Sequence, residues 1–263
     1  MNKGNERKRI FLRIAYDGTN YVGWQIQKNG LAVEEVINQK LSELTKEKIV
    51  IIGASRTDSG VHAFGNVAVF DTKSNIPANR FSYALNQRLP DDIRIQESFQ
   101  VANDFHPRYT QSISKTYEYR VLNSCFERPT ERFYTHYVYF PMDIDKMREA
   151  AQYIIGEHDF KSFCSMHSQV QTTIRTVYCL DIQKKNDIIT FSISGNGFLY
   201  NMVRIIVGTL LKVGGGAYPP EHVREIIDAC DRTKAGPKVP AKGLFLKEIS
   251  YGDIKKQNKS IKK

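Results

Sequence analysis

The sequence predicts an α+β fold of two split βαβ domains, each with an antiparallel sheet and with helices on one face. Segments of alternating apolar residues, typical of half-buried strands, are interleaved with segments whose apolar residues recur at helical spacing. The order strand-helix-strand-strand-helix-strand occurs twice along the 263 residues. This is the split βαβ order of ferredoxin-like and RRM-like domains. The two halves share no sequence period, so we expect a repeat of architecture only.

The first half begins with a strand at 9–16, where apolar residues alternate until Asp17-Gly18 ends the strand. An apolar stripe at helical spacing predicts a helix at 33–46. The remaining elements of this half are strands at 48–54 and 64–72, a helix at 77–88 that a proline opens and a proline stops, and a short strand at 93–98.

The second half repeats the order with one extra helix. Its predicted elements are a strand at 112–122, a helix at 143–155, hairpin strands at 173–184 and 188–195, helices at 199–213 and 219–230, and a strand at 243–250. We therefore predict an N-terminal domain at 1–105, a C-terminal domain at 106–252 and a Lys-rich, disordered tail at 253–263.

The charge of the chain indicates a polyanionic partner, most often a nucleic acid. The formal net charge is +10 and the pI is about 9.3. Residues 1–13 carry five basic groups and one acid, and residues 252–263 carry five lysines and Asp253. The body at 14–251 holds 28 basic and 26 acidic groups. A nucleic-acid site must therefore be argued from single positions.

Composition excludes several classes of protein. With 41% hydrophobic and 25% charged residues, the chain is typical of a globular protein rather than a disordered or fibrous one. The apolar stretch at 202–213 is interrupted by Arg204 and Lys212, so we expect no membrane-spanning helix. The four cysteines form no CxxC pair, so we expect neither a zinc cage nor a redox dithiol. Together with an N-terminus that has no apolar core, they predict a cytoplasmic protein.

The densest polar cluster lies at 53–63, between two predicted strands, and contains Arg56, Asp58 and His62. It is compatible with an ordinary polar turn, because Asp-Ser-Gly favours turns. It also suits chemistry, because a carboxylate beside a guanidinium is held ionised and oriented, as a nucleophile or a base requires.

Basic and aromatic residues alternate in the next candidate segment, a strand at 115–120. Lys115, Tyr117 and Tyr119 would share one face of it. Such a face can pair with phosphate and stack on bases; the alternative is a half-buried strand whose tyrosines pack the core. Arg108, which follows Phe105-His106-Pro107, adds a second basic and aromatic site nearby in sequence.

Arg204 stands among apolar residues of the predicted helix at 199–213. A buried arginine is costly unless an acid pairs with it, and Asp58 is a candidate. The alternative is an arginine at the helix surface whose stem covers apolar groups. The six histidines show no metal-ligand spacing, and the sequence has no phosphate-loop, dinucleotide-binding, nucleophile-elbow or zinc-protease motif.

Six short segments form a recognisable series along the chain. They are Tyr16-Asp17-Gly18 with Gly23-Trp24-Gln25, the run from Arg56 to Ala63, Phe105-His106-Pro107-Arg108, Lys115-Thr116-Tyr117, the run from Phe198 to Arg204, and Gly243-Leu244-Phe245-Leu246. In this order and spacing the chain resembles the TruA family of tRNA pseudouridine synthases over nearly its whole length. It departs from the common pattern at Ser55, where many members have Gly, and at Ser59, where many have Ala. Both residues are small, so we expect the loop geometry to be retained.

The resemblance implies the pseudouridine synthase fold, with its two domains joined side by side. It implies an isomerase that converts uridine to pseudouridine at positions 38–40 of the tRNA anticodon stem-loop, without cofactor or metal, as a homodimer. Asp58 matches the family's essential aspartate, Tyr117 a tyrosine that stacks on the target base, and Arg204 the basic residue that pairs with that aspartate.

Further residues complete the predicted site. We expect Arg56 and Leu244 to contact the substrate, with Leu244 in the wall of a closed apolar pocket, and Arg108, Lys115 and His62 to contact RNA. Two alternatives stay open. The two serines suggest a TruA-like paralogue that acts on ribosomal or other RNA, and the sheet aromatics and basic ends suggest an RNA-binding module without catalysis.

Overall fold

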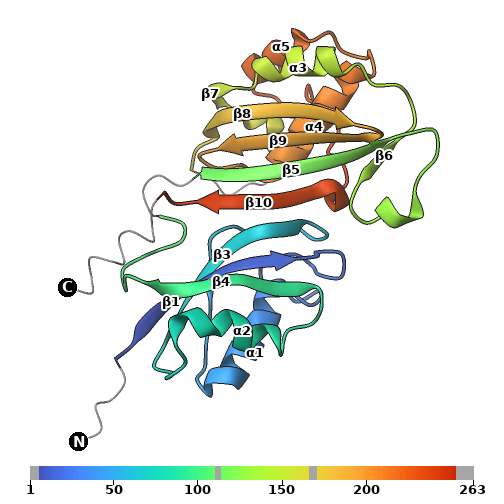
Figure 1. Ribbon diagram of the computed structural model, residues 1–263. Helices are drawn as coiled ribbons and strands as arrows, with labels where there is room; N and C mark the ends of the chain where they lie inside the picture. Colours follow the sequence, from blue (N-terminus) through green and yellow to red (C-terminus); the bar gives the residue numbers. More distant parts are fainter. Residues whose placement is uncertain (1–5, 110–113, 166–170, 253–263) are drawn as a thin grey trace, which may run out of the picture. The chain divides into compact units, whose positions relative to one another are not determined.

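The structure is a computed structural model that describes residues 6–109, 114–165 and 171–252 (Figure 1). The chain divides into two compact units. Unit 1 comprises the residues before Ser114 together with those from Leu246 onward, and unit 2 comprises Ser114–Phe245. The division falls inside strand β10 (Leu244–Ser250), which therefore contributes residues to both units.

Unit 1 is an antiparallel sheet with two helices. Its elements are β1 (Lys8–Tyr16), α1 (Val33–Thr45), β2 (Ile52–Gly53), β3 (His62–Thr72), α2 (Phe81–Asn86) and β4 (Ile93–Val101). β1 lies between β3 and β4, and β2 pairs with β3. The two helices lie together on one side of this sheet (Figure 1). The apolar face predicted for the first strand is buried at Ile10, Leu12 and Ile14, but Phe11 is 1% exposed, so burial does not alternate strictly along β1.

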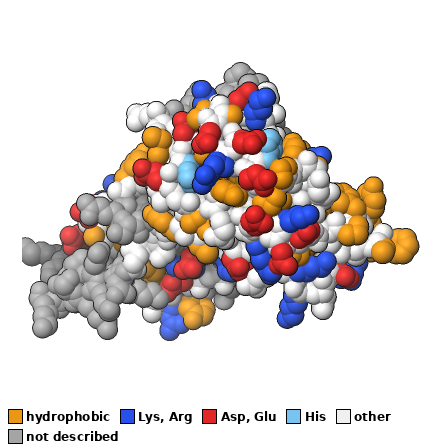
Figure 2. Space-filling view, turned by 90° about the horizontal axis from the view of Figure 1, so that it is seen from above, with side chains coloured by type: hydrophobic (Ala, Val, Ile, Leu, Met, Phe, Trp, Pro, Cys, Tyr) orange, Lys and Arg blue, Asp and Glu red, His pale blue; other side chains and the backbone are white. Residues whose placement is uncertain are grey.

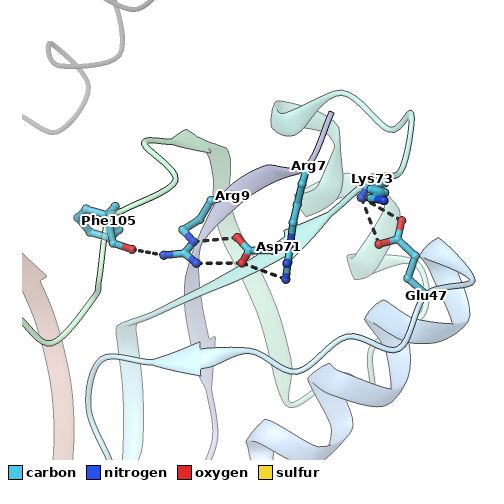
Figure 3. A network of polar contacts seen from close by, with 6 residues as sticks. All are labelled: Arg7, Arg9, Glu47, Asp71, Lys73 and Phe105. Atoms are coloured by element: carbon cyan, nitrogen blue, oxygen red, sulfur yellow. Dashed lines mark hydrogen bonds and ion pairs between the residues drawn. The ribbon is translucent and has the colours of Figure 1, made fainter. Parts of the chain in front are cut away.

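A network of charged groups ties the start of β1 to the rest of unit 1 (Figure 3). The Arg9 guanidinium donates two hydrogen bonds of 2.8 Å to the Asp71 carboxylate of β3, and a third of 2.9 Å to the carbonyl of Phe105. Arg9 holds the pKa of Asp71 below its ordinary value of 3.8. The network fixes the segment around Phe105, which leads to Arg108.

Unit 2 is a second antiparallel sheet with its own helices. Its elements are β5 (Ser114–Asn123), β6 (His136–Val138), α3 (Ile144–Gln152), β7 (Gly156–Asp159), β8 (Ile174–Lys185), β9 (Ile188–Gly195), α4 (Met202–Gly214) and α5 (His222–Ala229). The strand order is β5-β9-β8-β7, and the short β6 runs parallel to β5. Every residue of α4 except Lys212 is buried, so α4 is a core helix even though it carries Arg204.

The predicted α+β class is confirmed, and so is the element order of the first half; the second half contains two strands more than predicted, and several bounds are corrected. The strand expected at 48–54 forms only at Ile52–Gly53. Side chains of α1 capture its earlier amides: Ser42 Oγ accepts the N–H of Ile49 at 3.0 Å, and Asn38 Oδ1 accepts that of Ile51 at 2.8 Å. Those amides are thus satisfied without a sheet ladder.

Helix starts are corrected in a similar way. The helix expected at 77–88 is a 3₁₀ turn at Ala78–Arg80 followed by α2. The helix expected at 199–213 begins at Met202, because Asn201 adopts a left-handed conformation with φ of 62°. The short strands β6 and β7 and three further 3₁₀ turns were not predicted; the turns lie at Pro129–Glu131, Lys161–Phe163 and Ala241–Gly243.

Some expectations stay predictions. The predicted domain limits, 1–105 and 106–252, are not the limits of the compact units, because unit 1 also includes the residues from Leu246 onward. The tail at 253–263 lies outside the described residues. Among the residues that the structure describes, none of the helices is both long and apolar enough to cross a lipid bilayer.

Candidate active site

Two loops of unit 1 form one structure around Asp58. One loop follows β1 and contains Gly23-Trp24; the other connects β2 to β3 and contains Thr57-Asp58. Gly23 and Asp58 form an isolated antiparallel bridge, and the N–H of Trp24 donates to the carbonyl of Thr57 at 3.0 Å. Two motifs that lie more than thirty residues apart in the sequence are thus hydrogen-bonded through their backbones.

The next turn of the same two loops is held by Tyr21. Its carbonyl accepts the hydroxyl of Ser59 at 3.2 Å and the N–H of Gly60 at 3.4 Å. The Tyr21 hydroxyl in turn donates to Asp92 Oδ1 at 2.6 Å. Burial raises the pKa of the Tyr21 hydroxyl, and the bond to Asp92 raises it further, so this donor stays protonated.

Two glycines permit the close approach of the loops. Gly23 has φ of +111°, and a Cβ there would lie 2.5 Å from the carbonyl oxygen of Thr57. A Cβ on Gly18 would lie 2.0 Å from the carbonyl oxygen of Val61. Neither position accepts a side chain without a shift of backbone, which explains why glycine stands at both.

Exposure varies along the loop that carries Asp58. Ser55 and Thr57 are buried, Arg56 is exposed, and Asp58 is half-buried. The Asp58 carbonyl accepts the N–H of Val61 at 3.1 Å, which closes the turn. The loop therefore presents a guanidinium and a carboxylate while its buried residues anchor it. The segment therefore forms the turn that the sequence predicts, and it also carries the carboxylate and the guanidinium that the predicted chemistry requires.

His62 lies inside unit 1, at the start of β3, and is 2% exposed. Its Nδ1 accepts the backbone N–H of Gly18 at 3.1 Å and lies 3.1 Å from Asp17 Oδ1. A buried ring offers little surface to RNA. Its geometry supports a role in fixing the two loops rather than in direct RNA contact.

Arg108 contacts the end of β2, just before the loop that carries Asp58. Its Nε donates to the carbonyl of Gly53 at 2.6 Å, and its N–H donates to His106 Nδ1 at 3.1 Å. Glu34, in the first turn of α1, was not among the predicted site residues; its N–H donates to the carbonyl of Trp24 at 3.0 Å. Burial raises the pKa of Glu34, while the charges of Arg108 and Arg56 oppose that rise. The acid was hidden in the sequence because acids are common in the first turn of any helix.

Arg204 of unit 2 is buried in α4, so it is not the surface arginine of the alternative interpretation. Its Nε donates to the carbonyl of Val239 at 2.8 Å, and its Nη1 donates to Asn201 Oδ1 at 2.9 Å. The left-handed Asn201 therefore both starts the helix and orients the guanidinium. Asn201 stands in the run from Phe198 to Arg204, but the sequence alone does not indicate its contact with Arg204.

The tyrosines of β5 also belong to unit 2. Tyr117 is buried, and its ring meets that of Phe198 edge to face, with centroids 5.2 Å apart. Tyr119 is fully buried and donates to the carbonyl of Pro240 at 2.8 Å. Burial raises the pKa of Tyr119, and the Arg204 charge opposes this rise. Both tyrosines therefore pack within unit 2, and the stacking of Tyr117 on a base stays a prediction.

Two further predicted residues of unit 2 are located by the structure. Lys115 lies two residues before Tyr117 on β5, opposite Gly195 of β9, and is partly exposed. Leu244 begins β10 and is 6% exposed. The predicted contact between Arg204 and Asp58 concerns different units, and it stays a prediction.

The remaining features to consider are groups of metal-ligating side chains and the distribution of surface charge. Within the described ranges, no group of three His, Cys, Asp or Glu side chains could hold a metal ion. On the face seen in Figure 2, basic and acidic side chains are interspersed. That pattern is in line with the nearly balanced charge of the body of the chain.

Comparison with known proteins adds an independent finding. A family model described as tRNA pseudouridine synthase matches residues 13–110 and 150–252. The chain belongs to this family. The matched residues include Asp58, Arg56, Arg108 and Arg204, and the family resemblance read from the sequence is confirmed.

Curated relatives of the family are similar over most of the chain. A tRNA pseudouridine synthase A of Thermoanaerobacter sp. (strain X514) is 48% identical over 244 residues, which cover 93% of this chain and 100% of the relative. A protein of the same name from Acetivibrio thermocellus is 48% identical over 244 residues, again 93% and 100%. A tRNA pseudouridine synthase A 2 of Clostridium perfringens is 47% identical with the same coverage.

Proposed function

We propose that the protein isomerises uridine to pseudouridine at positions 38–40 of the tRNA anticodon stem-loop, with Asp58 as the essential carboxylate. Isomerisation of uridine in tRNA is the activity of the family to which the chain belongs. The positions and the role of Asp58 are the proposal. The observation that carries it is the bridge between Gly23 and Asp58, which fixes a half-buried carboxylate beside the exposed Arg56.

The chemistry requires a carboxylate that is held in place. The C1′–N1 bond of the nucleotide breaks, the uracil turns, and a C1′–C5 bond forms; the C5 proton leaves and N1 gains one. The base must leave the stack before these atoms are accessible, at a cost of a few kcal/mol. Stacking on Tyr117 recovers part of that cost, since base–aromatic stacking contributes about 1–3 kcal/mol.

The other residues take supporting roles in this proposal. Arg56 contacts the substrate beside Asp58, Arg204 favours the anionic carboxylate, and Leu244 contributes apolar wall that retains the detached uracil. A double-mutant cycle of Asp58→Asn and Arg204→Met, read out as the free energy of unfolding in urea, tests the pairing of the two residues. Coupling close to zero would remove Arg204 from this role.

Arg108 and Lys115 contact the RNA backbone in the proposal, and their removal weakens binding and reduces its salt dependence. His62 is reassigned to the support of the catalytic loop. The protein acts without cofactor, as a homodimer, in the cytoplasm. Sedimentation of the purified chain, alone and with tRNA, tests the dimer.

The test of the activity uses the wild-type chain. Tritium released from tRNA labelled at C5 of uridine reports the formation of pseudouridine. Binding without release would instead favour a non-catalytic RNA-binding module, which the basic ends of the chain motivate.

The test of the target uses a deletion strain. Loss of pseudouridine at tRNA positions 38–40 supports the proposal. Unchanged tRNA with loss elsewhere would favour a paralogue acting on ribosomal or other RNA, which Ser55 and Ser59 motivate.

A further inference from the structure

Two buried hydroxyls meet directly beneath the loop that carries Asp58. The Tyr16 hydroxyl lies 2.7 Å from Thr57 Oγ1, and either can be the donor. Tyr16 ends β1 and is 5% exposed; Thr57 immediately precedes Asp58 and is 8% exposed. A bond this short between two groups held away from water is shielded from competition by solvent.

Asn66 of β3 completes the arrangement and is fully buried. Its Oδ1 accepts the N–H of Val67 at 2.8 Å, which fixes which end of the amide is the donor. Its Nδ2 then donates to the Tyr16 hydroxyl at 3.3 Å and to the carbonyl of Ser55 at 3.1 Å. One side chain thus holds both Tyr16 and the loop.

The anchored atoms lie on both sides of Arg56. Ser55 is held by its carbonyl, and Thr57 is held by its hydroxyl and by its carbonyl, which accepts the N–H of Trp24. The anchors come from β1, from β3 and from the neighbouring loop, so they fix the loop in three directions. The position of Asp58, one peptide further on, follows from that of Thr57.

We propose that Tyr16, supported by Asn66, is a positioning residue that acts through Thr57 to hold the Asp58 carboxylate at its reacting position. The inference rests on the proposed function of Asp58. It concerns the orientation of the catalytic group rather than its identity. Neither hydroxyl needs to touch the substrate for this role.

The ring of Tyr16 allows the role to be separated from packing. It packs against Trp24 with centroids 5.9 Å apart, and this contact remains when the hydroxyl is removed. Tyr16→Phe and Thr57→Val therefore delete one partner each with little change in volume. Thr57→Ser keeps the hydroxyl and serves as the conservative rescue.

The experiment measures tritium release at saturating tRNA, tRNA Kd and thermal unfolding for each variant. We expect Tyr16→Phe and Thr57→Val to lower kcat by about 10- to 100-fold, since small misplacements of a reacting group have effects of this size. Kd stays within about twofold of wild type. The double variant is no slower than the slower single variant, because both remove the same bond. Thr57→Ser restores most of the rate.

Thr72→Val is the matched control. Thr72 is also on β3, is 1% exposed, and donates from Oγ1 to Glu47 Oε1 at 2.9 Å. Thr72→Val also removes a buried hydroxyl, but one that lies away from the Asp58 loop, so we expect its kcat to stay at the wild-type level. If Tyr16→Phe and Thr57→Val lose no more rate than Thr72→Val, the inference is overturned.

The outcomes also separate this inference from the proposed function. A wild-type chain that releases no tritium, or an active Asp58→Asn, overturns the proposed function. If the wild type is active and Asp58→Asn is inactive, but Tyr16→Phe is as fast as the wild type, only the positioning role is overturned. Additive losses in the double variant would likewise overturn a shared path through Thr57.

Discussion

The Nδ1 atom of His62 accepts the backbone N–H of Gly18 at 3.1 Å, and the ring that provides it is 2% exposed. The bond joins the loop after β1 to the start of β3. His62→Leu leaves that N–H buried and unpaired, which costs about 1–3 kcal/mol. We expect urea unfolding to register this loss, while the salt dependence of RNA binding stays unchanged because the ring is buried.

The control for this prediction is His222→Gln. His222 is more exposed and pairs with Glu225 one helical turn away, so its loss changes stability by less than about 0.5 kcal/mol. If His62→Leu were as stable as His222→Gln but bound RNA with a reduced salt slope, His62 would contact RNA directly.

Gly23→Ala tests the backbone contact between the two loops. Both Gly23 and Gly216 have positive φ, of +111° and +79°, so alanine is strained at either position. Only at Gly23 does the new Cβ meet backbone, 2.5 Å from Thr57; Gly216 has nothing within 4 Å. We expect Gly23→Ala to lose about 1–3 kcal/mol more than Gly216→Ala in urea unfolding, and to lose turnover as well.

Equal losses of stability in the two glycine variants would mean that the loops do not touch as described. A Gly23→Ala chain that unfolds at lower urea but keeps the wild-type kcat would separate the contact from catalysis.

The pair of Arg9 and Asp71 makes part of the stability depend on pH. Arg9 lowers the pKa of Asp71 from 3.8, so the folded state favours the carboxylate. The stabilisation is complete well above 3.8 and is lost as pH falls through the lower, folded-state pKa. We expect Arg9→Met to be less stable than wild type at pH 7, with the difference shrinking below about pH 4.

Urea unfolding at constant ionic strength, down to the lowest pH at which both chains fold, measures this difference. Arg94→Met is the control, since its partner Asp91 is fully exposed and such pairs contribute about 0–1 kcal/mol. A difference between wild type and Arg9→Met that grows towards acid pH would contradict the assignment.

The Lys-rich end of the sequence gives a prediction about binding alone. Trimming residues 255–263 removes five lysines. We expect weaker RNA binding and a smaller slope of log K against log salt, by at most about 4.5, with turnover at saturating RNA retained. The full-length chain with the five lysines changed to glutamine should behave alike. Loss of turnover at saturating RNA would mean that the end takes part in the reaction.

Much of the architecture follows from periodicity, and the exceptions have local causes. The strand at 188–195 was predictable because its alternation is strict, and the strand at 9–16 because Ile10, Leu12 and Ile14 share one face. The strand predicted at 48–54 forms only at Ile52–Gly53, because Asn38 and Ser42 of α1 bind its earlier amides. No local pattern reveals contacts between residues this far apart in the sequence.

Only part of the candidate site could be predicted from the sequence, again because some of its contacts join residues far apart along the chain. Ionisable side chains such as Asp58 and Arg204 could be predicted as site residues from their type and from the residues around them. Tyr16, Thr57 and Asn66 could not, since a tyrosine at a strand end or an asparagine in a strand has many ordinary explanations. Their role depends on hydrogen bonds between residues about ten to fifty positions apart.

The most direct test of the account is tritium release by Asp58→Asn at saturating tRNA, with tRNA binding measured in parallel. The substitution keeps the shape of the side chain and removes its charge. The matched control is Asp91→Asn, an exposed carboxylate of the same unit. The account predicts no detectable release by Asp58→Asn, nearly unchanged tRNA affinity and a fully active control. Release at the wild-type rate by Asp58→Asn would contradict it.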